Sequence, residues 1–214
     1  MKKYIDYKNE ISEAELYDGL VGFGLFAEKI PNFLTSEEFL KFTKTLQFPI
    51  NDKPKDYIRY SNIRNINIPR PFAIPEPFAY ANLCKSLSDN WIEIKRHFED
   101  KTVNETYKVS RIHLRKLHER EELFEMNYKN FSKDGAPEQD IVIKSRFIAS
   151  ADISTCFPSV YSHSIAWSLV GKNYAKINKN PTNWFNQIDY YTRNVKFGET
   201  NGLLIGPHAS NLLS

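Results

Sequence analysis

The sequence predicts an α+β fold that is rich in helices. Apolar residues recur at helical spacing over residues 78–98 and again over residues 184–195. A short run of apolar and small residues at 147–151 is typical of a buried strand. The chain has 214 residues, of which 41% are hydrophobic, so it is long enough to build one or two domains with a proper core.

The N-terminal part is expected to contain two helix starts and one irregular stretch. Residues 12–15 and 35–38 each place a serine or threonine before acidic residues, which is the pattern of a helix N-terminus. Residues 49–69 are expected to be irregular because they contain a turn cluster. The four prolines within residues 69–77 enforce an extended path into the helix over residues 78–98.

Basic residues interleave with aromatic and aliphatic residues in two stretches, 57–70 and 107–117. The first contains Arg70, and the second contains Arg111 and Arg115. This mixture suits contact with a nucleic-acid backbone or a triphosphate. An ordinary solvated surface is the alternative, and the sequence leaves both interpretations open.

The stretch around Asp152 combines a strand, an acid, a turn and a helix. The run at 147–151 ends at Asp152, a turn is predicted at Pro158-Ser159, and Ser162 is a candidate N-cap for a helix that ends at Gly171. A carboxylate at the end of a buried strand is unfavourable unless it is paired or binds a metal. Magnesium is held by one or two carboxylates together with substrate oxygens. Asp152 is therefore a candidate metal ligand.

The remaining elements are simpler. Residues 133–138 form a hairpin-like loop. Residues 172–183 are expected to be a connection, residues 184–195 an amphipathic helix, and residues 198–202 a turn. Trp91 is expected to lie in the core rather than to act as a stacking platform.

The sequence from residue 152 to residue 165, Asp-Ile-Ser-Thr-Cys-Phe-Pro-Ser-Val-Tyr-Ser-His-Ser-Ile, resembles the first palm motif of reverse transcriptases. It is most similar to the bacterial retron and abortive-infection branch of that family. The resemblance implies that Asp152 is the catalytic metal ligand and that Ile153 lends its backbone carbonyl to the same metal. It also implies that the ring of Phe157 blocks a ribose 2′-hydroxyl.

Two further segments resemble motifs of the same family. The C-terminal stretch, residues 200–214, is similar to the Gly-x-Pro-x-Gly-Pro-x-x-Ser turn that opens a helix against the template base and the incoming nucleotide, so Gly206 and Ser210 would bind nucleotide. This sequence departs from that motif at Leu204, where many relatives have Pro, and at Ile205, where many have Gln. Residues 69–77 resemble the Arg-Pro-x-x-Ile-Pro segment of the fingers, in which Arg70 would face nucleotide phosphates.

The resemblance implies an RNA-directed DNA polymerase, a nucleotidyltransferase that uses two Mg²⁺ or Mn²⁺ ions. Its partners would be an RNA or DNA template and primer and deoxynucleoside triphosphates, and its role would be bacterial antiviral defence. Residues 1–145 would form an N-terminal region and helical fingers, and residues 146–214 part of a palm with a small antiparallel sheet. The family's second acidic motif, an aromatic-x-Asp-Asp hairpin, does not occur after Ser210, so the chain by itself is expected to be inactive.

Two alternatives stay open. A nuclease with a ribonuclease-H-like core would also place an acid after an apolar strand, with Asp189 and Glu199 as further carboxylates. A non-catalytic nucleic-acid-binding or assembly module would need Asp152 only as a buried, satisfied carboxylate. A homo-oligomer is compatible with any of the three.

Composition adds few restrictions. The net charge of +3 neither demands nor excludes a nucleic-acid partner. The two cysteines, Cys84 and Cys156, form no metal-ligand pattern and are expected to be small buried hydrophobes in a reducing cytoplasm. The sequence has no apolar run long enough to cross a bilayer and no signal-peptide pattern at its first residues, so neither a membrane protein nor a secreted one is expected.

Overall fold

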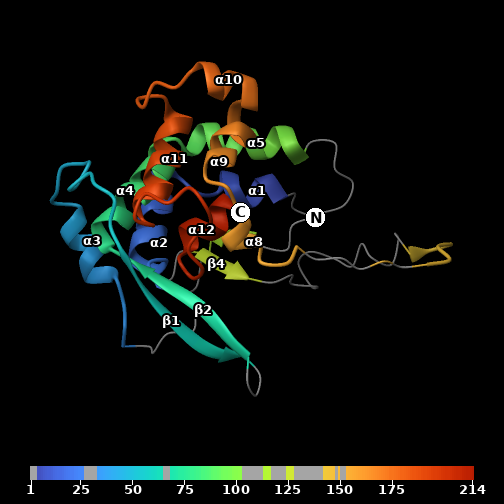
Figure 1. Cartoon of the computed structure of the whole chain (residues 1–214), viewed down its shortest axis with the longest axis horizontal. Coiled ribbons are helices and arrows are strands. Elements are labelled where there is room, and N and C mark those ends of the chain that lie inside the picture. Colours follow the sequence, from blue (N-terminus) through green and yellow to red (C-terminus); the bar gives the residue numbers. More distant parts are fainter. Residues whose placement is uncertain are drawn as a thin grey trace.

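The computed structural model describes residues 4–26, 33–64, 68–102, 113–116, 124–127, 142–147, 149 and 153–214. The helices of the N-terminal half are α1 (Tyr4–Asn9), α2 (Glu13–Phe23), α3 (Glu37–Thr43), α4 (Pro77–Asp89) and α5 (Trp91–Thr102). The later helices are α8 (Cys156–Ser159), α9 (His163–Val170), α10 (Lys172–Ile177), α11 (Trp184–Asn194) and α12 (His208–Leu213). The strands are β1 (Tyr57–Arg64), β2 (Ile68–Pro75), β3 (His113–Lys116) and β4 (Phe124–Asn127). β1 pairs with β2 and β3 with β4, both antiparallel, so the helix-rich α+β class is confirmed (Figure 1).

Both predicted helix starts near the N-terminus are present, but they differ chemically. At α2, Ser12 and Glu15 form a capping box: the Glu15 N–H donates to Ser12 Oγ at 3.3 Å, and the Ser12 N–H donates to Glu15 Oε2 at 2.9 Å. At α3, the Ser36 side chain does not cap the helix. Its hydroxyl instead donates to the carbonyl oxygens of Val21 and Gly22, both at 2.7 Å. These two contacts connect the start of α3 to the C-terminal part of α2.

The hydrophobic core is built around α4, which packs against both α2 and α11. The helix starts at Pro77, where the Glu76 carboxylate accepts a hydrogen bond from the Ala79 N–H at 2.8 Å. The apolar cluster around α4 also takes in Ile165, Ile188 and Leu203 from the C-terminal third of the chain. Residues from both predicted units, 1–145 and 146–214, therefore share one core.

The single helix predicted over residues 78–98 is divided in two. α4 ends before Asn90, whose side chain donates to the Ser86 carbonyl at 2.7 Å, and α5 begins directly after it. The break turns Trp91 inward, where its side chain is fully buried and its Nε1–H donates to the Ile11 carbonyl at 2.8 Å. The prediction that Trp91 belongs to the core is confirmed.

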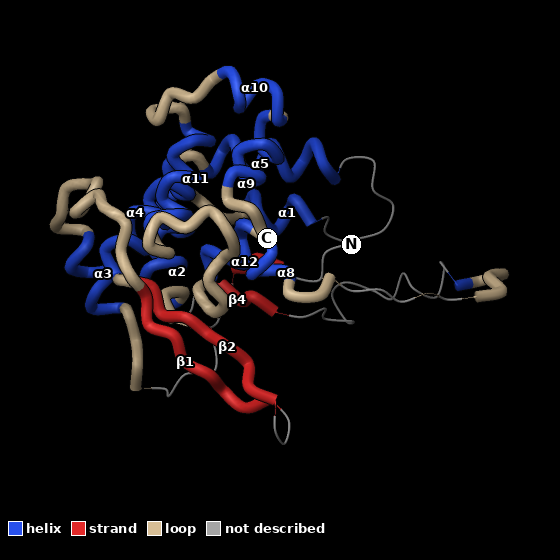
Figure 2. The backbone as a smooth tube through the Cα atoms, in the orientation of Figure 1, coloured by secondary structure: helices blue, strands red, loops and turns tan. Residues whose placement is uncertain are grey.

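The prediction that residues 49–69 are irregular is wrong for the second half of that stretch. β1 and β2 form an antiparallel hairpin that projects from the helical body (Figure 2). Tyr57 pairs with Pro75 and Arg64 with Ile68 at its two ends. The strand β2 was not predicted, because it contains prolines and proline is normally taken as a break in a sheet.

The hairpin accommodates its prolines because they all fall on one side of the ladder. Alternate residues of an antiparallel strand direct their N–H groups toward the partner strand and away from it. The Ala73 N–H donates away from β1, to the Ile205 carbonyl at 2.8 Å. Pro69, Pro71 and Pro75 occupy the same alternate positions as Ala73, so none of them removes a hydrogen bond from the β1–β2 ladder.

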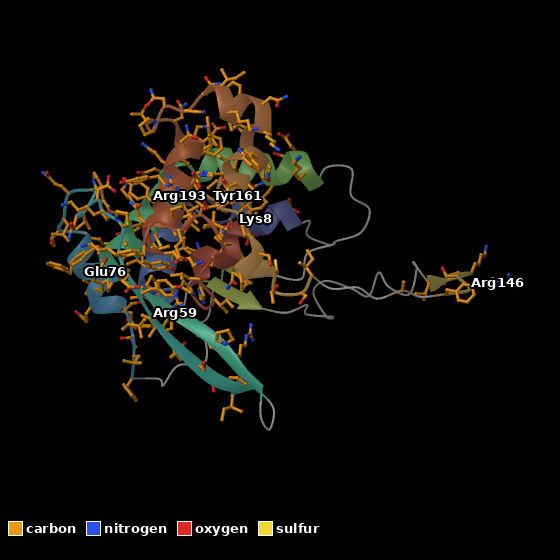
Figure 3. All side chains as sticks on the ribbon, viewed as in Figure 1. Lys8, Arg59, Glu76, Arg146, Tyr161 and Arg193 are labelled. Carbon is orange, nitrogen blue, oxygen red and sulfur yellow. The ribbon has the colours of Figure 1, made fainter. Side chains whose placement is uncertain are left out.

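Two more expectations are corrected. The connection predicted at residues 172–183 contains the helix α10. The buried strand predicted at residues 147–151 is not found in its described part: Phe147 and Ala149 lie in no strand, and Phe147 is 90% exposed. An apolar run forms a buried strand only when a neighbouring strand and a packed face accept it, and the described part of this run has neither. Figure 3 shows the adjacent Arg146 away from the helical body. The loop predicted at residues 133–138 lies outside the described residues.

None of the helices in the described part of the chain is long and apolar enough to cross a membrane.

Candidate nucleotide-binding site

Residues 153–161, which follow Asp152, lie side by side with residues 200–214, here called the Gly-Pro segment. The Leu203 N–H donates to the Phe157 carbonyl at 2.7 Å, and the Gly202 N–H donates to the Val160 carbonyl at 2.6 Å. Tyr161 and Asn201 form an isolated antiparallel bridge next to these bonds. Backbone hydrogen bonds thus hold the two segments in a fixed register.

The hairpin joins the same arrangement through β2. The bond from Ala73 to Ile205 places β2 against the Gly-Pro segment on the side away from β1. Arg70 lies three residues before Ala73 on this strand and is partly exposed. Its guanidinium carbon lies 5.2 Å from the centre of the Phe72 ring, which in turn stacks on Tyr60 at 5.5 Å. Aromatic contacts therefore hold the side chain of Arg70, the basic residue that would face nucleotide phosphates according to the resemblance to polymerase fingers.

The chain already turns at Thr155, before the turn that was predicted at Pro158-Ser159. Thr155 adopts a left-handed conformation with φ 52° and ψ 40°, and the short helix α8 follows it. The turn predicted at Pro158-Ser159 forms the end of that helix. Phe157 is half-buried and packs against the main core, whereas Ile153 is 72% exposed. The structure thus fixes the ring of Phe157 and leaves the side chain of Ile153 in solvent.

Gly202 is needed where the two segments cross. Its φ of +85° lies in the region that side chains rarely adopt, and a Cβ there would stand 3.0 Å from the Pro158 carbonyl oxygen. The neighbouring Lys196 bonds the Asn201 carbonyl and pairs with Glu199 at 2.9 Å. Glu199, one of the carboxylates that a ribonuclease-H-like site would use, is thus engaged in a surface ion pair.

The helix α12, which carries the end of the Gly-Pro motif, is docked on the loop after α2. The Gly24 carbonyl accepts two hydrogen bonds, from the His208 N–H at 2.8 Å and from the Tyr80 hydroxyl at 2.7 Å. The same Tyr80 oxygen accepts from the Ala209 N–H at 3.3 Å. Burial raises the pKa of Tyr80 well above its usual value, so the phenol stays protonated and donates.

The ring of His208 is enclosed by this docking. The residue is only 5% exposed, and neither ring nitrogen has a hydrogen-bond partner among the described residues. Burial lowers the pKa of His208 to about 4, because the charged ring would lose its hydration. The imidazole is therefore neutral at pH 7. Ser210, two residues later, is also buried, and Gly206 before the helix has a φ of +126°.

Replacing Gly24 by alanine is expected to lower the free energy of unfolding by about 1–3 kcal/mol, because the new methyl group would overpack this contact. A Cβ at Gly24 would stand 2.7 Å from His208 Cβ and 2.7 Å from the Leu20 carbonyl oxygen. Urea unfolding followed by circular dichroism measures the effect. Gly22→Ala is the matched control, because its Cβ meets only the movable end of Leu40 at 3.0 Å. Equal unfolding midpoints for the two variants would contradict the docking role of Gly24.

The other predicted site residues are not gathered here. Asp152 and Arg111 lie outside the described residues. β3 packs against α1. Arg115 lies in β3, and only its backbone is described. Its neighbour Lys116 pairs with Glu15, and the bonds from Lys116 and Ser12 hold the pKa of Glu15 at about 2. The charge of Lys116 is therefore used in an ion pair within the fold.

The expected metal donors are only partly described. Ile153 is described, and Ser154 and Thr155 after it offer further oxygens, which are the donors that Mg²⁺ prefers. A two-metal centre needs more than one carboxylate, and the described residues contain no group of three or more His, Cys, Asp or Glu side chains that could hold a metal. The donors among the described residues, which do not include Asp152, do not by themselves make a complete two-metal centre.

A cluster formed by His163, Asp189 and Arg193 was not predicted from the sequence. Asp189 lies in α11, four residues before Arg193, and its carboxylate reaches His163 at the start of α9. A helical carboxylate of this kind is not the strand acid that the ribonuclease-H-like alternative required. The spacing of Asp189 and Arg193 could have suggested a pair within one helix, but nothing local pointed to His163.

Comparison with known proteins gives no further assignment: no protein-family model matches the chain, and no curated protein matches it significantly.

Proposed function

We propose that this chain is the fingers and the first part of the palm of a reverse-transcriptase-like DNA polymerase. The complete protein would transfer deoxynucleotides to a primer along a nucleic-acid template. The family resemblance further favours a cytoplasmic role in bacterial antiviral defence.

The observation that supports this proposal most is the meeting of three segments. Each segment resembles a separate polymerase motif, and hydrogen bonds join them: Ala73 to Ile205, and Leu203 to Phe157. Segments that resembled these motifs only by chance would not be expected to be neighbours in the fold. Their proximity supports a common role, with Arg70 on the hairpin as the candidate phosphate contact.

The proposed roles follow from this arrangement. Asp152 and the Ile153 carbonyl would hold Mg²⁺ or Mn²⁺, which when bound neutralises phosphate charge during nucleotidyl transfer. Phe157, fixed by its packing on the core, would exclude a 2′-hydroxyl from the sugar site. Arg70 would offer its guanidinium to the triphosphate, since planar guanidinium groups bind phosphate oxygens well. Gly206 would let the backbone approach the nucleotide closely.

The test is nucleotide incorporation by the complete protein as its gene encodes it. Asp152→Ala is expected to lower incorporation of deoxynucleotides by more than about a hundredfold, because a metal ligand is lost. Asp100→Ala, which removes an exposed acid of α5, is the matched control and is expected to behave as wild type. Absence of metal-dependent incorporation, or unchanged activity of Asp152→Ala, would disprove the proposal.

Sugar selection gives a second readout in the same assay. Phe157→Ala is expected to raise incorporation of ribonucleotides relative to deoxynucleotides by at least about tenfold, because the ring that excludes the 2′-hydroxyl is removed. Phe157→Tyr keeps the ring and is expected to keep the selection. Phe147→Ala is the control, since Phe147 is exposed and close in sequence. Unchanged selection in Phe157→Ala would remove the proposed role of this ring.

A further inference from the structure

A second candidate site lies among α9, α10 and α11. A cavity of about 350 Å³ opens there, lined by His163, Trp167, Lys176, Asp189 and Arg193 among others. Its volume falls within the range of small-molecule sites in proteins. Figure 3 shows Arg193 and Tyr161 in the helical part of the molecule, away from Arg59 on β1.

Asp189 is the unusual member of this cavity. The residue is 6% exposed, and its Oδ2 accepts a hydrogen bond from His163 Nδ1 at 2.7 Å and lies 3.5 Å from Arg193 Nε. Its other oxygen, Oδ1, is buried and has no hydrogen-bond partner within the described ranges. Buried carboxylate oxygens normally have partners, because an unsatisfied one loses its hydration without compensation. Because Asp189 also lines the cavity, its carboxylate suits a ligand that carries an N–H donor.

The charges around Asp189 favour an anion. Lys176 and Lys179 line the cavity and are exposed, and Arg193 adds a third cation. Arg193 is held in place by Asp189 and by the ring of Tyr190, whose centre lies 5.9 Å from its guanidinium carbon. Three cations face one carboxylate, so the cavity keeps an excess of positive charge that can attract phosphate oxygens.

The walls of the cavity also contain aromatic rings. Trp167 and Tyr190 both line it, and rings of this kind stack on nucleobases. We propose that this cavity binds a nucleoside monophosphate, with a base N–H donating to the Asp189 carboxylate and the phosphate held by Lys176 and Lys179. The cavity uses none of the residues of the proposed polymerase site. It would therefore be a second nucleotide site rather than part of the first.

The α8–α9 turn connects the two sites physically. The ring of Tyr161 meets His163 edge-on, with the ring centres 5.0 Å apart, and lies 5.6 Å from Trp167. Tyr161 also pairs with Asn201 at the Gly-Pro segment. A ligand in the cavity would thus contact side chains that pack directly on the polymerase-like segments.

The experiment is calorimetric titration of the purified protein with AMP, GMP, CMP and UMP in EDTA, which removes metal-dependent binding at the polymerase site. At least one monophosphate is expected to bind saturably. The double variant Lys176→Ala/Lys179→Ala is expected to bind it at least about tenfold more weakly, because two phosphate contacts are lost. The double variant Lys41→Ala/Lys53→Ala removes two exposed lysines elsewhere and is expected to bind as wild type.

Two further ligands test whether the nucleobase contributes to binding. Ribose 5-phosphate and inorganic phosphate lack the N–H donor and the stacking surface, so both are expected to bind at least about tenfold more weakly than the nucleotide. Phe147→Ala is expected to leave binding unchanged, because Phe147 is exposed and does not line this cavity. The proposal is overturned if no monophosphate binds saturably, if the Lys176/Lys179 variant binds normally, or if phosphate binds as tightly as the nucleotide.

Discussion

Replacing Trp91 by alanine is expected to lower the free energy of unfolding by about 4 kcal/mol or more, which can unfold a domain of ordinary stability. The side chain stands at the start of α5, is fully buried and belongs to the main apolar cluster. Alanine would leave a cavity of nearly the whole ring. It would also leave the Ile11 carbonyl without the Nε1–H donor at 2.8 Å.

Trp91→Phe separates these two contributions. Phenylalanine keeps most of the buried ring but removes the N–H, so a smaller loss of about 1–2 kcal/mol is expected. Chemical unfolding at pH 7, followed by far-ultraviolet circular dichroism, measures both variants. Trp184→Ala, at a partly buried position on α11, is the control and is expected to be milder than Trp91→Ala. A loss below about 1 kcal/mol for Trp91→Ala would show that the N-terminal helices do not depend on this side chain.

Lowering the pH from 6.5 to 4 is expected to remove roughly 3 kcal/mol of stability through His208 alone. Burial lowers the folded-state pKa of His208 from 6.5 to about 4. The unfolded chain therefore binds a proton in this range that the folded chain does not, and stability falls as the pH falls. The contribution is fully present above the unfolded pKa, near pH 6.5, and is lost progressively as the pH approaches 4.

Unfolding free energies at pH 7.5 and pH 4.5, measured for wild type and His208→Phe, test this prediction. The variant is expected to lose less stability on acidification, because it has no ring nitrogen to protonate. His97→Gln is the control: burial also lowers the pKa of His97, but this residue is half-buried, so its contribution is expected to be smaller. The same acid dependence in wild type and His208→Phe would contradict the assignment.

His208 also links stability to the proposed function. Its protonation would put a charge between α12 and the Gly24 loop, where the ring has no partner among the described residues. That contact fixes the helix that carries Ser210.

Local chemistry in the sequence determined much of the helical structure. The capping pattern at Ser12 and the helical spacing around α11 were predicted correctly, because each depends on residues within a few positions of one another. The turn before the helix α12 was expected only from the resemblance. The burial of Trp91 followed from the same periodicity. The resemblance to polymerase motifs likewise needed only short segments.

Tertiary structure decided where those segments meet and which of them form strands. Local propensity did not reveal β2, because its prolines are tolerated only through the side of the ladder on which they fall, and the register of β2 with β1 sets that side. The apolar run at 147–151 looked like a strand, but Phe147 is exposed in the fold. The pairing of His163 with Asp189 arises because α9 packs on α11. Strand pairing and buried charge clusters depend on contacts between distant residues, and only the folded chain brings those residues together.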